Sequence, residues 1–228
     1  MADADADREP SKGERTKQRI VACALELFRE RGYEATTMRM VADAAGVALG
    51  NAYYYFASKD QLLQAFYHEV HVAHVAASAP VLARERTLRD RLLGVMLAKL
   101  EVIEPYHRFS ALMFRSAADP ESPLNPFHAA SADIRREGEQ LFAEVLRGSR
   151  TSAPKALAGE LPNLMWTYSM GIVLYWIHDR SPGRARTRAL IERSVNLVAA
   201  SIKLAANPLL RPFQGKVLAL VRELQAGG

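Results

Sequence analysis

A short stretch of the chain, residues 36 to 59, concentrates side chains that can hydrogen-bond to nucleic acid or contact its bases. It reads TTMRMVADAAGVALGNAYYYFASK, with an arginine near its start, an asparagine and three consecutive tyrosines in its middle and a lysine at its end. Arginine and asparagine can read base edges, tyrosine can contact thymine methyl groups or the backbone, and lysine neutralises phosphate. What they do depends on the local structure that positions them.

The spacing of this stretch predicts two short helices joined by a tight turn. Thr37 can cap the first helix. Gly46 admits the positive backbone dihedral that a short turn needs, while Val47 fills the angle between the helices. The inner face of the first helix is predicted to consist of Met40, Val41 and Ala44.

The second short helix is predicted over residues 49 to 55. Gly50 and Asn51 lie at its start and let its amino end approach a duplex closely. The three tyrosines cannot all be buried, because successive helical positions point in different directions. We expect Tyr55 to face the core.

A longer amphipathic helix precedes these two. Thr16 is a suitable N-cap, and Gly32 is expected to end the helix. Residues 1 to 14 have a composition that buries little, and we expect a tail there. The apolar face of the helix is predicted to contain Ile20, Cys23, Ala24, Leu27 and Phe28.

Residues 16 to 60 resemble the DNA-binding domain of the tetracycline-repressor (TetR) family. The match comprises the threonine cap, the V-A-x-x-A-G-V core that begins at Val41, an aromatic run that ends at Phe56, and Ser58 with Lys59. The preceding helix, with Gly32 after it, is similar to the first helix of the family. The combination is specific, although it covers only about 45 residues of the chain.

The resemblance implies an all-helical dimer that binds double-stranded operator DNA. It implies phosphate contacts for Thr37 and Lys59 and a base contact for Arg39. Two positions depart from the common pattern: Ala48 replaces a frequent serine cap, and Tyr54 replaces a frequent histidine. The other residues implied at the groove are Leu49, Gly50, Asn51, Tyr53 and Tyr54.

The rest of the chain also carries helical patterns. The three prolines of residues 119 to 126 require a loop. We therefore expect a tail (1–14), a helix-turn-helix domain (15–60) and a helical sensor and dimerisation domain (61–228). Helices are predicted over residues 60–78, 88–104, 131–147, 154–178, 184–206 and 209–225, with a shorter one from Pro105.

The bulk composition fits this interpretation. The chain has 228 residues, of which 49% are hydrophobic, and a formal charge of +5, which permits but does not require nucleic-acid binding. No membrane span or signal peptide is indicated, so we expect a cytoplasmic protein. The single cysteine, Cys23, excludes an internal disulfide and is expected to be a buried thiol.

Aromatic and methionine side chains cluster in the predicted sensor domain. Each alone is typical of a core, but together they can line an apolar cavity, which the family resemblance implies in this half. We therefore expect a small, largely apolar effector. The candidate ligand-binding residues are Tyr106, Phe109, Met113, Phe114, Trp166, Tyr168, Met170 and Tyr175.

The sequence gives little indication of an enzyme active site or a metal site. No HExxH, GxSxG, P-loop or GxGxxG motif occurs, and Glu101 with Glu104 has no histidine partner set by spacing. His68, His71 and His74 recur every three residues, but a solvated or helix-lining face is favoured over a metal site. We therefore predict no enzyme, no cofactor and no metal.

The helix over residues 184 to 206 presents an apolar surface too wide for one neighbour, so a second helix must cover it. In the TetR family the last two helices of the sensor core usually form a four-helix bundle between protomers. Repression relieved by a ligand is the predicted function, and control by a partner protein is the alternative. The candidate dimer residues are Gly171, Leu190, Ile191, Ser194, Val195, Val198, Ser201 and Ile202.

Overall fold

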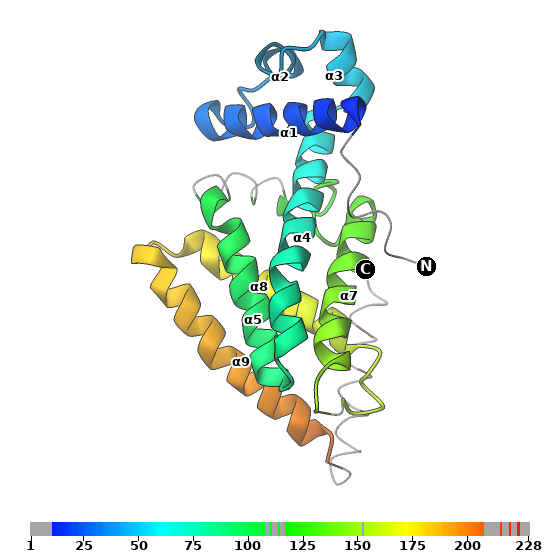
Figure 1. Cartoon of the computed structure of the whole chain (residues 1–228), viewed down its shortest axis with the longest axis vertical. Helices are drawn as coiled ribbons and strands as arrows, with labels where there is room; N and C mark the ends of the chain where they lie inside the picture. Colours follow the sequence, from blue (N-terminus) through cyan, green and yellow to red (C-terminus); the bar gives the residue numbers. More distant parts are fainter. Residues whose placement is uncertain are drawn as a thin grey trace. The chain divides into compact units, whose positions relative to one another are not determined.

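The computed structural model describes residues 11–107, 110, 114, 117–151, 153–207, 215, 219 and 223, and the regular elements within this part of the chain are helical. The chain divides into two compact units (Figure 1). Unit 1 combines Met1–Glu69 with Arg108–Ser131, and unit 2 combines Val70–His107 with Ala132–Gly228. The predicted all-helical fold is confirmed for the described residues.

Within its described residues, unit 1 contains three complete regular helices and the first part of a fourth. They are α1 (Lys12–Arg31), α2 (Met38–Ala44), α3 (Leu49–Tyr55) and the start of α4 (Lys59–Arg84), with a short 3-10 turn at Ala129–Ser131. Residues 119–126 form turns, as their prolines require.

The start of α1 differs from the sequence prediction. A capping box begins the helix at Lys12: the Ser11 hydroxyl accepts from the Glu14 N–H, and the Glu14 carboxylate accepts from the Ser11 N–H. Thr16 is already inside the helix, where its hydroxyl donates to the Lys12 carbonyl at 2.9 Å. The prediction that Thr16 caps the helix was wrong because this pair one turn earlier satisfies the first amides.

The core of unit 1 lies between α1, α2 and the start of α4. From α1 it takes Ile20, Val21, Ala24 and Phe28, whereas Cys23 and Leu27 are half-buried. In α2 the buried residues are Met38, Val41 and Ala42, while Met40 is half-buried and Ala44 is exposed. The predicted inner face of α2 was therefore rotated, because Met38 packs inward at the first helical position.

Within its described residues, unit 2 holds the rest of α4, four further α-helices and two short 3-10 helices. Helix α4 continues through Pro80, beyond the predicted end at residue 78. Helix α8 begins at residue 161 and not at 154, because residues 155–160 form turns and Pro162 lies in its first turn. The elements are α5 (Leu88–Ile103), η1 (Glu104–Tyr106), α7 (Ala132–Arg147), α8 (Leu161–His178), η3 (Pro182–Arg184) and α9 (Ala185–Ala205).

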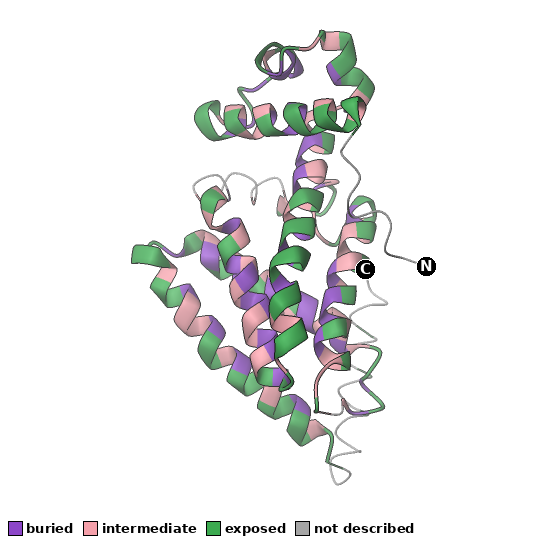
Figure 2. Ribbon diagram, viewed as in Figure 1, coloured by how far each residue is buried: buried purple, intermediate pink, exposed green. Residues whose placement is uncertain are grey.

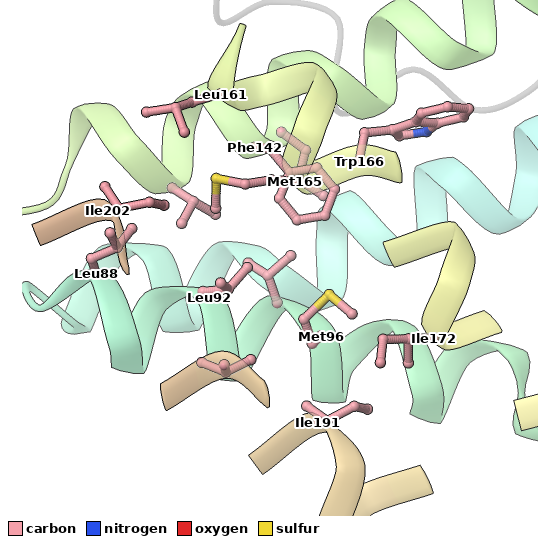
Figure 3. Close-up of a cluster of buried hydrophobic side chains, with 14 of the residues drawn as sticks. Leu88, Leu92, Met96, Phe142, Leu161, Met165, Trp166, Ile172, Ile191 and Ile202 are labelled. Carbon is pink, nitrogen blue, oxygen red and sulfur yellow. The ribbon is translucent and has the colours of Figure 1, made fainter. Parts of the chain in front are cut away.

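One hydrophobic cluster holds unit 2 together (Figure 3). Buried residues recur along one side of α5 (Figure 2), as the helical period predicts. Helices α7 and α9 pack against α5, and α8 packs against α7 and α9. The residues labelled in Figure 3 are Leu88, Leu92, Met96, Phe142, Leu161, Met165, Trp166, Ile172, Ile191 and Ile202.

A buried arginine ties the ends of two helices to α5. Arg91 is 3% exposed and is held by main-chain carbonyls rather than by a carboxylate. Carbonyls at helix C-termini lack intrahelical partners and carry partial negative charge, so a buried guanidinium is stabilised there. Arg91 donates to the carbonyls of Leu82, Glu85, Glu144 and Val145 at 2.6, 2.9, 2.7 and 2.9 Å.

The predicted helix over residues 209–225 lies outside the described residues, apart from three isolated positions. None of the helices described here combines the length and the hydropathy needed to cross a membrane.

Candidate functional site

Helices α2 and α3 are joined by the tight turn that the sequence predicts. Gly46 has a φ of +63°, a conformation that favours glycine. Its N–H donates to the Asp43 carbonyl at 3.1 Å, and the Val47 N–H donates to the Ala42 carbonyl at 3.0 Å. The two helices contact one another, so α2, the turn and α3 form a helix-turn-helix.

The N-caps of α2 and α3 differ, as the residue types at positions 37 and 48 lead us to expect. The Thr37 hydroxyl accepts from the Met40 N–H at 3.3 Å and so caps α2. Ala48 occupies the N-cap of α3 and offers no side-chain hydrogen bond. The side-chain cap that a serine would supply is therefore absent at Ala48.

The tyrosines of α3 point in different directions. Tyr53 is 50% exposed and Tyr54 is 81% exposed, whereas Tyr55 is half-buried. The Tyr54 and Tyr55 rings meet edge to face, with centroids 5.1 Å apart. Phe56, just after the helix, is 3% exposed and anchors α3 to the core. Tyr53 and Tyr54 of α3 therefore expose large aromatic side chains to solvent.

The other predicted DNA-binding residues lie around these tyrosines on the same two helices and their caps. Thr37, Arg39, Gly50 and Asn51 are exposed, and Leu49 is half-buried. A Cβ at residue 50 would meet no atom within 4 Å, so the surface there is open. Arginine, asparagine and tyrosine side chains of α2 and α3 are thus accessible to solvent.

Lys59, the first residue of α4, contacts Tyr33 within unit 1. Its Nζ donates to the Tyr33 carbonyl at 2.8 Å and lies 4.3 Å from the centroid of the Tyr33 ring. The Tyr33 hydroxyl in turn donates to the Asp60 carboxylate. Burial, followed by the hydrogen bond to Asp60, raises the pKa of Tyr33 well above its ordinary value. An ammonium has three donors, so Lys59 keeps donors for another acceptor.

Both halves of the chain match one family. Residues 20–66 match the family described as bacterial regulatory proteins of the tetR family. Residues 91–216, more than half of the chain, match the tetracyclin repressor-like C-terminal domain. The chain belongs to the tetR family.

Curated relatives of this TetR-family protein carry names of transcriptional regulators. It is 25% identical over 138 residues to the HTH-type transcriptional repressor KstR2 of Mycolicibacterium smegmatis, covering 60% of this chain and 66% of the relative. It is 30% identical over 131 residues to KstR2 of Mycobacterium tuberculosis, covering 56% and 62%. The matches thus span slightly less than two thirds of these repressors. The regulator SrpR of Pseudomonas putida is 29% identical over 170 residues, covering 73% and 74%.

Solved structures share the fold. A TetR regulator from Nitrosomonas europaea has a TM-score of 0.63 at 19% identity, covering 81% of this chain and 98% of that one. A tetR-family regulator from Streptomyces coelicolor has a TM-score of 0.61 at 22% identity, covering 93% and 97%. With both family matches, the protein is a helix-turn-helix transcriptional regulator, and this family is not one of enzymes.

The predicted ligand-binding residues that the structure describes differ in burial, and Trp166, Tyr168 and Met170 belong to the hydrophobic cluster of unit 2. Trp166 is buried in the unit 2 core, and Tyr168 is half-buried with its hydroxyl 2.6 Å from the Ser194 hydroxyl on α9. Tyr106 and Met170 are half-buried, whereas Tyr175 is 43% exposed. Phe114 belongs to unit 1, and Phe109 and Met113 lie outside the described residues.

A polar network closes one end of unit 2. The Trp176 Nε1–H donates to the Glu104 carboxylate at 3.0 Å, and His107 Nε2 lies 2.8 Å from the Trp176 carbonyl. Since a carbonyl only accepts, His107 Nε2 is the donor, and its Nδ1 accepts from Arg184 at 2.8 Å. Arg184 begins α9 in the left-handed region, with a φ of +55°. These hydrogen bonds connect the end of α5, the end of α8 and the start of α9. The spacing of these residues in the sequence does not indicate the network.

The three histidines of α4 do not share a surface. His68 is exposed, whereas His71 and His74 are buried at 9% and 5% exposure. The His71 Nε2 lies 3.7 Å from the Glu137 carboxylate of α7. Among the described residues, no three histidine, cysteine, aspartate or glutamate side chains are grouped to hold a metal ion.

Sequence reasoning did not single out Lys99, which lies on α5 near buried apolar residues. Lys99 is partly buried on α5, and burial lowers its pKa to about 8. Burial and the Lys99 charge lower the pKa of His74 to about 3. The signal was available, because Lys99 lies one turn after Val95 and two turns after Leu92 on the apolar side of α5.

The predicted dimer residues divide into two sets. The structure places Ile191, Val195 and Ile202 in the core of their own protomer, at 0, 0 and 7% exposure. A core side chain cannot also line a contact between protomers, so these three were wrongly assigned to the interface. Gly171 and Ser201 are exposed, and Leu190, Ser194 and Val198 are half-buried.

Proposed function

We propose that this regulator is a homodimeric repressor that binds a palindromic operator and is released from it by a small molecule bound within unit 2. Its relatives in two mycobacterial species are named repressors, which supports repression over activation. A twofold dimer that carries one helix-turn-helix per protomer matches a palindrome with half-sites about one helical turn apart.

The exposure of Tyr53 and Tyr54 carries the proposal. Exposing large aromatic side chains forfeits the stabilisation that their burial would contribute, about 1.5–3 kcal/mol for a ring such as that of phenylalanine. Folding alone therefore does not account for two such rings beside Asn51 on a short helix. Contact with thymine methyl groups and the sugar-phosphate backbone does account for them.

A second exposed feature supports dimerisation. Leu197 and Leu204 of α9 are 69% and 61% exposed, and half-buried Leu190 lies seven residues before Leu197. This heptad spacing, with Ser194 and Ser201 between the leucines, is typical of a helix seam. On α8, Leu174 is 41% exposed and Gly171 leaves open space. We call Leu190, Leu197 and Leu204 the leucine stripe.

The mechanism that we propose is a two-state equilibrium. One state of the dimer spaces its two α3 helices for successive major grooves, and the other does not. An effector that binds the second state more tightly shifts the dimer toward that state and so lowers its affinity for the operator. By linkage, bound operator lowers the affinity for the effector by the same factor.

Selection of bound fragments from random DNA, followed by fluorescence anisotropy, tests the proposal. The wild type should enrich a palindrome, and Tyr53→Ala should lose most of its affinity for it. Phe127→Ala is the matched control, because the Phe127 ring is 62% exposed outside the helix-turn-helix. Enrichment of no palindrome, or equal loss in both variants, would refute this assignment.

A further inference from the structure

Tyr33 contacts two oppositely charged residues of unit 1 through three different groups. It follows Gly32 at the end of α1, and its side chain is 9% exposed. Its carbonyl accepts from Nζ of Lys59 at 2.8 Å, and the same Nζ lies 4.3 Å from the centroid of its ring. Its hydroxyl donates to the carboxylate of Asp60. One buried residue therefore holds both a cation and an anion from the first turn of α4.

The core of unit 1 fixes Tyr33 independently of any DNA. Gly32 ends α1 with a φ of +86°, and the Thr36 hydroxyl donates to the Gly32 carbonyl at 2.8 Å. The Tyr33 ring packs against the ring of Phe28, with centroids 5.1 Å apart. A buried ring held in this way keeps one rotamer, so the direction of its hydroxyl is set by the fold.

Lys59 and Asp60 carry opposite charges that would otherwise attract one another. They are neighbours in the chain and both are half-buried, and such charges attract more strongly where water is partly excluded. Within the part of the chain that the structure describes, no ion pair joins them, and each is bonded to Tyr33 instead. Burial, followed by the hydrogen bond to Asp60, raises the pKa of the Tyr33 phenol, so the hydroxyl stays a donor at neutral pH.

The start of α4 is capped without Asp60. The Ser58 hydroxyl accepts from the Gln61 N–H at 3.3 Å, and the Gln61 carboxamide accepts from the Ala57 N–H at 2.7 Å. The Asp60 carboxylate is therefore not committed to the amides of the helix. Without the Tyr33 hydroxyl, the ammonium of Lys59 on its flexible stem is a cation that this carboxylate can pair with.

We propose that Tyr33 is a positioning residue for DNA binding, which keeps the Lys59 ammonium apart from the Asp60 carboxylate and so leaves it able to bind a phosphate of the DNA backbone. An ammonium has three donors and one is bonded to the Tyr33 carbonyl, so the others remain for DNA. This inference rests on the proposed function and gives a buried residue, which touches no DNA itself, a part in it.

Tyr33→Phe isolates the hydroxyl. It keeps the ring for the cation–π contact and the carbonyl for the hydrogen bond, but it leaves the Asp60 carboxylate without its donor. The carboxylate then pairs with Lys59 and withdraws the ammonium from the phosphate. Fluorescence anisotropy with a random-sequence duplex at several salt concentrations should show a salt slope lower by about one unit and an affinity about tenfold lower at about 0.1 M salt.

Asp60→Asn separates positioning from a structural role. Asparagine can accept from the Tyr33 hydroxyl but has no charge to pair with Lys59. The single variant should keep the wild-type slope, and Tyr33→Phe combined with Asp60→Asn should regain it. In Lys59→Met, whose slope is already lower by about one unit, adding Tyr33→Phe should lower it no further. Tyr67→Phe, at another half-buried tyrosine of unit 1, is the matched control and should bind as the wild type does.

A hydroxyl that only stabilised unit 1 would change the free energy of unfolding, measured by urea denaturation, but not the number of counterions released by DNA. A wild-type slope in Tyr33→Phe, or a lowered slope that Asp60→Asn does not restore, overturns the inference.

Selection of bound fragments from random DNA separates this inference from the proposed function. If a palindrome is enriched while Tyr33→Phe keeps the wild-type slope, the proposed function stands and the positioning role is wrong. If the slopes change as expected but no palindrome is enriched, the positioning role stands and the proposed function is wrong.

Discussion

The guanidinium of Arg91 occupies the space that a side chain at Gly148 would need. A Cβ built on Gly148 would lie 2.2 Å from Nη2 of Arg91 and 2.4 Å from its Cζ. The four carbonyls bound by Arg91 belong to the end of α4, to Glu85 directly after it and to the end of α7, so the guanidinium cannot move without losing several of these hydrogen bonds. Gly148 is therefore required for the packing of unit 2.

Gly148→Ala should lower the free energy of unfolding by about 2 kcal/mol, because overpacking displaces a buried, fully bonded group. Urea denaturation followed by circular dichroism measures the change. Gly159→Ala is the control, since a Cβ there meets nothing within 4 Å. Equal stabilities of the two variants would show that Arg91 relaxes at little cost.

Lys99 should make stability depend on pH in alkaline solution. Its pKa is about 8 in the folded protein, against an ordinary value of 10.5. Below pH 8 Lys99 is protonated in both the folded and the unfolded protein, so the folded state bears the full free-energy cost of burying the charge. Between about 8 and 10.5 the unfolded state binds more protons, so the free energy of unfolding rises with pH, by up to about 3 kcal/mol in total.

Lys99→Met should therefore be more stable than the wild type at neutral pH, and the difference should shrink as the pH rises through this window. Chemical denaturation at a series of pH values measures it. Lys155→Met should follow the wild type at every pH, since its side chain is exposed. A constant difference between Lys99→Met and the wild type would contradict the assigned burial.

His74 should contribute to acid sensitivity. Its pKa falls from 6.5 to about 3 on folding, first because of burial and then because of the Lys99 charge. Between these values the unfolded state takes up a proton that the folded state does not, so stability is lost as the pH falls, at about 1.4 kcal/mol per pH unit. His74→Gln, whose amide can still donate to the Val95 carbonyl, should flatten this slope, whereas His178→Gln at an exposed histidine should not.

Arg39 and Lys59 should differ in what they contribute to DNA binding. Arg39→Ala should narrow the affinity gap between operator and random DNA by about 1–3 kcal/mol, because a base contact is lost. Lys59→Ala should weaken binding to all sequences and lower the salt slope by about one unit, because a phosphate contact is lost. Anisotropy titrations at several salt concentrations measure both.

Lys59 also binds Tyr33, so the thermal stability of Lys59→Ala must be measured beside its DNA affinity. A change in sequence preference with an unchanged salt slope would show that the role assigned to Lys59 is wrong.

The leucine stripe should be required for dimerisation. Leu197→Asp would place an unpaired charge in the proposed contact twice, because the twofold axis duplicates it, at a cost of several kcal/mol. Light scattering should show monomers, and operator affinity should collapse while helical circular dichroism persists. Val72→Asp is the control, because Val72 is a 53% exposed valine of α4.

Leu197 is a better position for this test than Val198, which also packs against the core of unit 2. If Leu197→Asp remained dimeric and bound the operator, the interface would have to lie elsewhere.

Local chemistry made the DNA-binding half predictable from the sequence. The conformation of Gly46, the cap at Thr37 and the directions of the three tyrosines depend on residues close in the chain, and each was confirmed. The start of α1 was missed because a serine and a glutamate satisfied the first amides one turn earlier than expected.

The packing of unit 2 depends on contacts between residues far apart in the sequence. The sequence alone determined that α9 carries too wide an apolar surface for one neighbour. Only the tertiary structure decided which part is core, at Ile191 and Val195, and which part stays exposed, at Leu197 and Leu204. Likewise, helical periodicity places Lys99 on the apolar side of α5, but the burial that lowers its pKa depends on segments from elsewhere in the chain. Burial and charge compensation are properties of the packed assembly, because desolvation depends on every segment that surrounds a group.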